Sequence, residues 1–245
     1  MDLFDPLSFL IMSAGIFAGA VVSGLVGFAF SAVAGAILLH VLPPTEAVPL
    51  MMACSIVTQT VSLVSLRGSV KWRAEPSVIA GGALGLLPAL YLLHHVDAHV
   101  FRIGFGAFLV AYAAYMLLRR PAAGEQTVPS RLRHVVVGFG GGLIGGLTAM
   151  PGALMMIWCD HRGMAKDQQR AFSQPYTIAM QMIALALMVA HNTFSPQTLV
   201  SLTYSLPALL AGAALGVLMF RKINDAFFRS AVLGLLLFGG VGLVV

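Results

Sequence analysis

Gly24-Leu25-Val26-Gly27 and its partial echo, Gly145-Gly146-Leu147-Thr148, stand inside two long runs of the chain that hold no charged residue. Glycine lets a helix unwind, or lets another helix approach closely, because it has no side chain. The first run, from Pro6 to Leu39, is too long for one helix across a hydrocarbon layer of roughly 30 Å, which takes about 20 residues. We therefore predict two shorter helices joined at the glycines. Interrupted helices at matching positions of two halves are typical of the binding sites of secondary transporters.

The composition is that of a polytopic membrane protein: 59% of the 245 residues are hydrophobic, 9% are charged and the mean hydropathy is +0.92. A soluble domain carries about 25% charged residues, so a large water-soluble catalytic domain is excluded. The net charge of +5 comes from basic residues in short loops, which indicates topology signals and no nucleic-acid partner. Cys54 and Cys159 fall in apolar runs without CxxC spacing, so we expect free buried thiols and no metal.

One stretch, from Arg119 to Arg133, has the Pro, Gly and Ser content of a true linker. It separates two halves of similar length, in which apolar runs alternate with short polar connections. We predict a first membrane repeat over 1–120, a cytoplasmic linker over 121–132 and a second membrane repeat over 133–245.

The two halves resemble each other in residues as well as in the order of their apolar runs. At an offset of 122 residues, Gly24-Leu25 falls on Gly146-Leu147 and Gln59 falls on Gln181. Small residues coincide easily in membrane helices, but the shared order of runs favours an internal repeat.

The distribution of Lys and Arg decides the topology, since cytoplasmic loops carry an excess of both. If every run crossed once, the 14 Lys and Arg would divide evenly between the two sides. If run 135–159 instead enters and leaves on one side, or crosses twice as short helices, all of them except Arg102 fall together. The repeat extends this hairpin to 6–39. We thus predict an all-α polytopic membrane protein with two inverted structural repeats, each a broken or re-entrant helical hairpin followed by three transmembrane helices, with both termini outside.

Four motifs follow one another in the first half: Gly19 to Gly27, Leu42-Pro43-Pro44-Thr45-Glu46-Ala47-Val48, Arg67-Gly68-Ser69-Val70 and Gly81-Gly82-Ala83-Leu84-Gly85. In this order they resemble the TauE/SafE sulfite exporter family of membrane permeases. The second half is a weaker copy, with Gly140-Gly141-Gly142, Gly163-Met164-Ala165 and Gly212-Ala213-Ala214-Leu215-Gly216.

This resemblance covers nearly the whole chain. It implies secondary transport by alternating access, across the bacterial cytoplasmic (inner) membrane, of sulfite, a small organosulfur or sulfonate anion, or a small carboxylate. Where the family usually has a Gly-Ile-Gly-Gly-Gly-like run after the first break, this chain has Gly27-Phe28-Ala29-Phe30-Ser31, which predicts an altered pocket.

No Asp, Glu, Lys or Arg lies well inside a predicted span, so an anion would have to be bound without a full countercharge. Backbone N–H groups at the N-termini of half-helices supply partial positive charge and free donors instead. Tight helix packing is the alternative role for the glycines. The predicted substrate-binding residues around the breaks are Gly24, Gly27, Ser31, Gly146, Thr148, Pro151 and Gly152.

Gln59 and Gln181 are the sharpest polar candidates, since each lies in the middle of an apolar run and the repeat makes them equivalent. A buried amide needs hydrogen-bond partners, so the pair is predicted to face one central cavity and donate to substrate oxygens. Hydrogen bonding that only holds helices together is the alternative. Ser55 and Gln174 lie at helical spacing from the two glutamines and complete the predicted set.

The remaining polar residues predict no enzyme chemistry. No Ser/His pair or double Asp set stands in the spans, so we predict no catalytic residue and no cofactor. His94, His95 and His99 are expected to be solvated at the outer interface without a metal. Glu46 and Asp160 flank spans and are candidates for relaying protons as a coupling ion. A homodimer and a non-transporting membrane scaffold stay open.

Overall fold

The apolar runs form helices throughout the computed structural model, which describes residues 6–26, 29–65, 75–118, 131–164, 166–220 and 225–244. Proline is the first residue of four of these helices, where its missing N–H would have no helical partner in any case. The described residues form ten helices: α1 (Pro6–Val26), α2 (Phe30–Leu38), α3 (Pro44–Ser65), α4 (Pro76–His95), α5 (Ala98–Leu118), α6 (Arg131–Thr148), α7 (Gly152–His161), α8 (Lys166–Ala190), α9 (Pro196–Phe220) and α10 (Asp225–Val244).

Both long runs are broken, as the sequence predicted, but not at Gly24 or Gly146, which lie within α1 and α6. The first run is also not two short helices, because α1 has 21 residues and is itself long enough to cross a membrane. Helix α1 ends at Val26 and α2 begins at Phe30, while α6 ends at Thr148 and α7 begins at Gly152. The second arms are short, with 9 residues in α2 and 10 in α7. At 1.5 Å per residue each is about 15 Å long, which is roughly half of the hydrocarbon thickness. Neither short helix therefore crosses a bilayer by itself.

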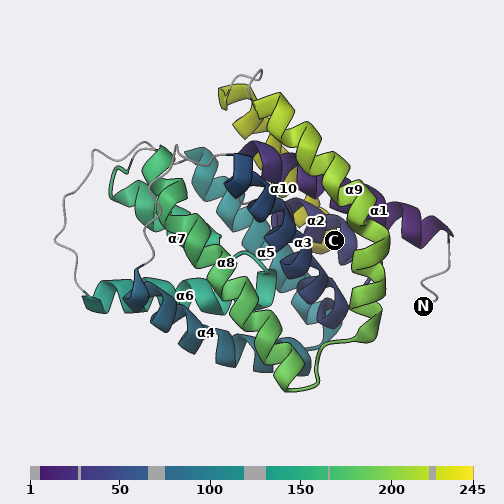
Figure 1. Cartoon of the computed structure of the whole chain (residues 1–245), viewed down its shortest axis with the longest axis horizontal. Coiled ribbons are helices and arrows are strands. Elements are labelled where there is room, and N and C mark those ends of the chain that lie inside the picture. The colour runs from purple at the N-terminus through teal and green to yellow at the C-terminus, as the bar shows by residue number, and fades with distance from the viewer. Residues whose placement is uncertain are drawn as a thin grey trace.

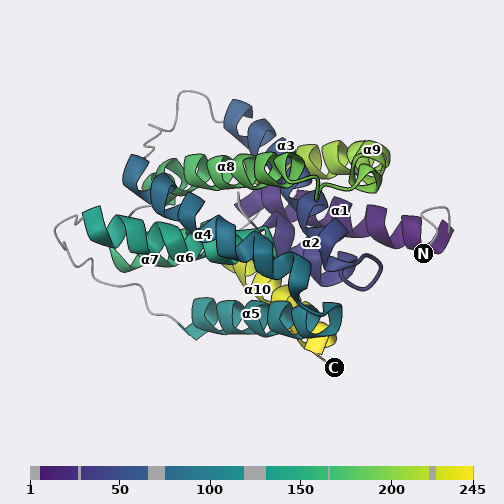
Figure 2. The ribbon, with the colours of Figure 1, turned by 90° about the horizontal axis from the view of Figure 1, so that it is seen from below.

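The most extensive helix contacts run between the two halves of the chain. Helix α4 packs along α6 and α1 packs along α9, while α5 pairs with α10 (Figures 1 and 2). If α1 to α5 are matched in order with α6 to α10, then α4 corresponds to α9 and α6 corresponds to α1. The α4–α6 contact therefore corresponds to the α9–α1 contact. The α5–α10 contact and the smaller α3–α8 contact are each matched with themselves.

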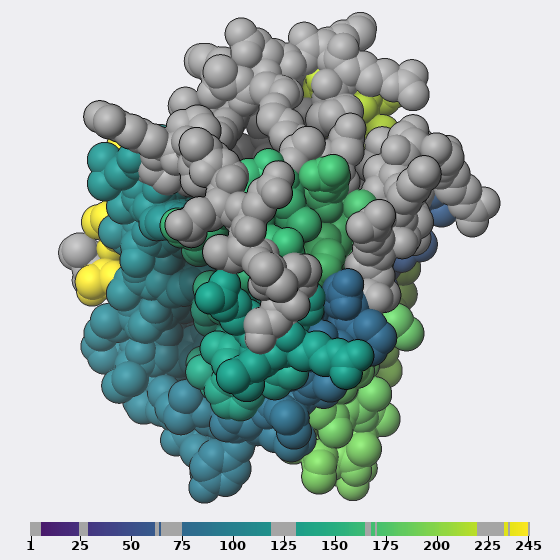
Figure 3. Space-filling view, turned by 90° about the vertical axis from the view of Figure 1, so that its left-hand side faces the viewer, coloured from purple at the N-terminus to yellow at the C-terminus, as the bar shows by residue number. Residues whose placement is uncertain are grey.

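Glycines permit the closest of these contacts. A Cβ at Gly85 of α4 would overlap the backbone oxygen of Phe139, and one at Gly142 of α6 would overlap that of Gly82. The first turns of α4 (blue) and α6 (bluish green) lie against each other in Figure 3. At the α1–α9 contact, a Cβ at Gly216 would likewise overlap the backbone oxygen of Val21. Small residues therefore let these backbones touch, as is usual between membrane helices.

Five segments of the described residues are long and apolar enough to cross a membrane: Pro6–Gly24, Pro76–His95, Ala98–Leu118, Ala171–Ala190 and Pro196–Met219. They belong to α1, α4, α5, α8 and α9. The sequence had assigned span length to the runs that form α3 and α10 as well, and neither is among these five. The predicted linker lies outside the described residues except for 131–132, which already belong to α6.

Candidate functional site

The start of α2 meets the break between α6 and α7 in the interior of the molecule. Ser31, in the first turn of α2, donates a hydrogen bond of 2.9 Å from Oγ to the backbone oxygen of Ala149, which lies between α6 and α7. Ser31 is 1% exposed and Ala149 is 2% exposed. The start of one short helix therefore lies beside the residues that lead into the other, although 118 residues separate them in sequence.

The backbone of the second break is unusual. Ala149 has a φ of 55°, a left-handed conformation that costs an L-residue other than glycine some free energy. Pro151 is the N-cap residue of α7, and Ala29 is that of α2; neither side chain caps its helix by a hydrogen bond. The N-terminal ends of both short helices therefore keep their partial positive charge without a side-chain acceptor at the cap.

Two glutamines link α3 and α8 to the second break. Gln59 of α3 donates from Nε2 to Oε1 of Gln181 on α8 over 3.1 Å, and also to Ser55 Oγ over 2.9 Å. Gln181 in turn donates from Nε2 to the Ala149 oxygen over 3.2 Å. Each glutamine is 1% exposed. We call this hydrogen-bonded group, Ser31, Ser55, Gln59, Ala149 and Gln181, the amide junction.

The amide junction is polar but uncharged. No Asp, Glu, Lys or Arg occurs among the buried side chains of the residues that the structure describes. Hydroxyls extend the polar group within the first half, where Ser23 Oγ and Thr58 Oγ1 are 3.2 Å apart and Thr58 donates to the Ser55 oxygen. Any charge that enters this region would be stabilised by dipoles and hydrogen bonds rather than by a countercharge.

Several predicted site residues do not form part of the amide junction. They pack against a neighbouring helix or bond within their own helix. A Cβ at Gly24 would lie 2.9 Å from the backbone oxygen of Ala213, and one at Gly146 would lie 2.5 Å from Ala89 Cβ. The close approach of α9 and of α4 therefore accounts for glycine at these positions. Thr148 donates to the Ile144 oxygen of its own helix over 2.8 Å.

The other predicted residues lie around the second break. A Cβ at Gly152 would be 2.7 Å from Thr177 Oγ1, and Pro151 fills the space over Gly145. Gln174 is buried on α8, nearly two turns before Gln181. Gly27 lies outside the described residues.

Sequence reasoning missed Ala149 and Thr177. The signal was present, because the offset of 122 residues that relates Gln59 to Gln181 also places Ala149 opposite Gly27 and Thr177 opposite Ser55. Ala149 acts through its backbone oxygen, however, and no residue type marks a backbone acceptor.

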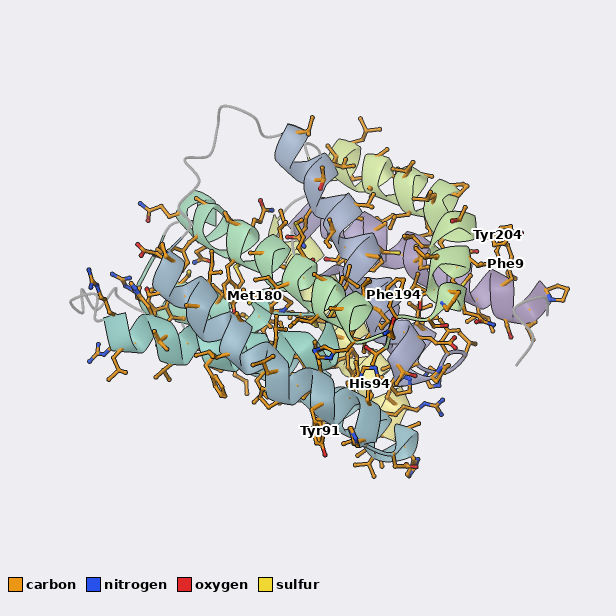
Figure 4. All side chains as sticks on the ribbon, turned by 60° about the horizontal axis from the view of Figure 1, so that its bottom comes forward. Phe9, Tyr91, His94, Met180, Phe194 and Tyr204 are labelled. Atoms are coloured by element: carbon orange, nitrogen blue, oxygen red, sulfur yellow. The ribbon has the colours of Figure 1, made fainter. Side chains whose placement is uncertain are left out.

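A second candidate region, lined by apolar and histidine side chains, lies at the far end of α4. A groove of about 380 Å³ runs between the last turns of α4 and α8, with Tyr91, His94, His95 and His191 among its lining residues. Figure 4 labels Tyr91 and His94, both on α4. His94 and His95 each bond through Nδ1 to a backbone oxygen one turn earlier. Within the described part of the chain, no three His, Cys, Asp or Glu residues are grouped as metal ligands.

Comparison with known proteins adds one match. The sequence model of a family described as Sulfite exporter TauE/SafE matches residues 11–243. No curated protein and no solved structure matches the chain.

Proposed function

The chain belongs to the sulfite exporter TauE/SafE family, and from this premise we propose that it is a secondary transporter that moves a small anion by alternating access. Members of this family are multi-pass membrane transporters and not enzymes. The anion is sulfite or a small organosulfur or sulfonate anion, and the membrane is the bacterial cytoplasmic membrane. Small carboxylates are the alternative substrate class.

The amide junction carries this proposal. Two helix breaks and two buried glutamines, each pair drawn from both halves, converge on one uncharged group at the start of α2 and before α7. Helix N-termini attract anions through free N–H groups and the helix dipole. Transporters built from repeats bind substrate at such interrupted helices.

The exchange of helix partners between halves supports the inverted repeat. An α4–α6 contact mirrored by an α9–α1 contact, with α5–α10 matched to itself, is the pattern that a twofold relation between the halves produces. If each half of the chain forms one helical bundle, two bundles that pack against each other in this way are suited to rocking about a central site. The glycine contacts would form part of the rigid framework.

An anion-flux screen tests the function. The purified protein in liposomes should move at least one of sulfite, sulfate, alkyl sulfonates and small carboxylates faster than empty liposomes do. A pH gradient of either sign tests proton coupling, for which Glu46 in the first turn of α3 and Asp160 near the end of α7 are the candidates. If no anion moves at all, the protein is a non-transporting scaffold and the proposal is wrong.

Side-specific labelling tests the orientation. A single cysteine replacing Lys166, at the start of α8, should react with a membrane-impermeant reagent from the cytoplasmic side. One replacing Asn192, in the exposed turn after α8, should react from outside. The buried Cys54 and Cys159 would be replaced by serine in this background. Labelling of position 166 from outside would contradict the hairpin at α6–α7. Crosslinking in membranes decides whether the protein forms a homodimer.

A further inference from the structure

The orientation of both amides in the junction is fixed by a backbone group. A glutamine side chain presents an oxygen that only accepts and a nitrogen that only donates, and the two are told apart by their partners. The partner of Gln181 is the oxygen of Ala149, a carbonyl that accepts only. The nitrogen of Gln181 must therefore face Ala149, which leaves its oxygen towards Gln59.

The same logic fixes Gln59. Because Gln181 presents its oxygen, Gln59 must present its nitrogen, and the 3.1 Å contact between them is then a hydrogen bond. Turning Gln59 over would bring two amide oxygens together. Turning both amides over would place the Gln181 oxygen against the Ala149 oxygen. The chain of bonds from Ala149 thus allows one arrangement only.

In this arrangement one buried hydrogen-bond acceptor has no donor among the described residues. Oε1 of Gln59 is buried and has no hydrogen-bond partner among the described residues, although the whole side chain is 1% exposed. Buried amide oxygens nearly always have a partner, and one without a partner costs free energy. A ligand that offers a donor would remove this cost.

We propose that Gln59 Oε1 accepts a hydrogen bond from the substrate, so that the transported anion carries an O–H or N–H group as well as its negative charge. This inference rests on the proposed function. The short-helix N-termini beside Ser31 and Ala149 favour the negative charge, and the oxygen of Gln59 selects the donor. Hydrogen sulfite and hydroxyalkyl sulfonates fit this description. A fully deprotonated oxyanion would meet the lone pairs of Oε1 and be disfavoured.

Matched pairs of anions test the inference on the unmodified protein in liposomes. 2-Hydroxyethanesulfonate should have a KM about tenfold lower than ethanesulfonate, since a polar group left unpaired in a buried site discriminates by roughly this factor or more. For sulfite, the initial rate at equal pH on both sides should follow the hydrogen sulfite fraction as pH is varied. Equal KM values within the sulfonate pair, or a sulfite rate that follows the dianion, would overturn the inference. Absence of flux for every anion would instead overturn the proposed function and the inference with it.

Variants assign the preference to the acceptor. Gln59→Met should bring the ratio of the two sulfonate KM values close to one, because methionine has a similar length and no amide oxygen. Gln181→Met should also lower the ratio, because nothing then fixes the orientation of Gln59. Ser31→Ala should raise both KM values together and keep their ratio, since Ser31 bonds to Ala149 and not to Gln59.

Gln197→Met is the matched control, because Gln197 is an exposed amide in the first turn of α9 and should leave both KM values unchanged. If Gln59→Met retains the preference of the unmodified protein, then Oε1 is not its source and the inference fails. The anion pairs on the unmodified protein decide the outcome even if Gln59→Met does not fold.

Discussion

The two halves of the chain share one helical plan but hold their central glutamines differently. Each half has a long helix, a short helix and three further long helices, in that order. In the first half, Gln59 is bonded to Ser55 of its own helix. In the second half, the equivalent hydroxyl of Thr177 donates to the Ser173 oxygen, and Gln181 bonds to the Ala149 oxygen in the break. Both halves thus have the same order of helices, whereas their glutamines make different hydrogen bonds.

This difference separates two kinds of contact: helix contacts through glycine, which tolerate no side chain, and side-chain hydrogen bonds, in which one group can replace another. Helix contacts through glycine involve backbone atoms, so any side chain at the contact disrupts packing along the whole helix. The hydroxyls around the glutamines make individual bonds that another hydroxyl or a backbone group can replace. Experiments that change equivalent residues in the two halves measure each kind of constraint.

The largest effect is expected from the helix contacts. Gly85→Val in α4 and Gly216→Val in α9 should each lower stability by about 3 kcal/mol or prevent folding, because the new side chain would overlap the backbone oxygen of Phe139 or Val21. The measurement is the melting temperature in detergent together with the yield of monodisperse protein. Gly104→Ala is the control, since no atom lies within 4 Å of a Cβ there. If only one of the two valine variants is damaged, the two contacts are not equivalent.

The next effect concerns Gly24 and Gly146, which the predicted repeat places at equivalent positions. Gly146→Ala should lower stability by about 1–3 kcal/mol through overlap with Ala89 Cβ. The double variant Gly146→Ala with Ala89→Gly should recover most of the loss, because one methyl group is then present at the contact, on α6 instead of on α4, and the overlap is gone. Gly24→Ala meets the backbone oxygen of Ala213, so no side-chain exchange should rescue it. Melting temperatures of these variants decide the matter. Failure of the double variant to recover would mean that Gly146 is needed for more than packing, as substrate binding would require.

The third comparison is between the two glutamines. Gln181→Leu and Gln59→Leu should lower stability by similar amounts, about 1–2 kcal/mol, because each removes two hydrogen bonds and leaves Oε1 of the other glutamine as an unpaired buried acceptor. Both variants should raise the KM for the transported anion if the junction binds it. Melting temperature and KM are measured on the same preparations. Lower stability with an unchanged KM in both would assign the glutamines to helix packing alone.

The sequence predicted the breaks, and the equivalence of Gln59 and Gln181, for physical reasons. A charge-free run that is too long for one helix across the bilayer is expected to be interrupted. Glycine and the Pro151-Gly152 pair are the residues at which a helix is most easily interrupted. An amide in the middle of an apolar run needs a partner, but the sequence left open whether that partner is the substrate or another helix, and the bond between the two glutamines was not predicted.

The contacts between helices were less predictable. Glycine occurs throughout the membrane helices, so the sequence did not identify α4–α6 and α1–α9 as the close pairs, nor that Gly24 and Gly146 face them. The role of Ala149 could not be predicted either. Its contribution is a backbone oxygen held by a left-handed residue, and neither feature depends on the alanine side chain.

The smallest effect is expected at Ala149 itself. The predicted repeat, with its offset of 122 residues, places this alanine opposite Gly27, so Ala149→Gly would make the two halves more similar in sequence. Relief of the left-handed conformation should stabilise the folded state by about 1–2 kcal/mol, and the greater freedom of glycine in the unfolded chain should offset about 0.5–1 kcal/mol of this. The melting temperature should therefore rise slightly, whereas Ala107→Gly, at an exposed position in α5, should lower stability by about 1 kcal/mol.

Transport should be retained, because Ser31 and Gln181 bond to the backbone oxygen, which the substitution leaves in place. Equal losses of stability in the two variants would mean that alanine is not strained at this break. A loss of transport with a raised melting temperature would mean that the strain itself helps the break to move.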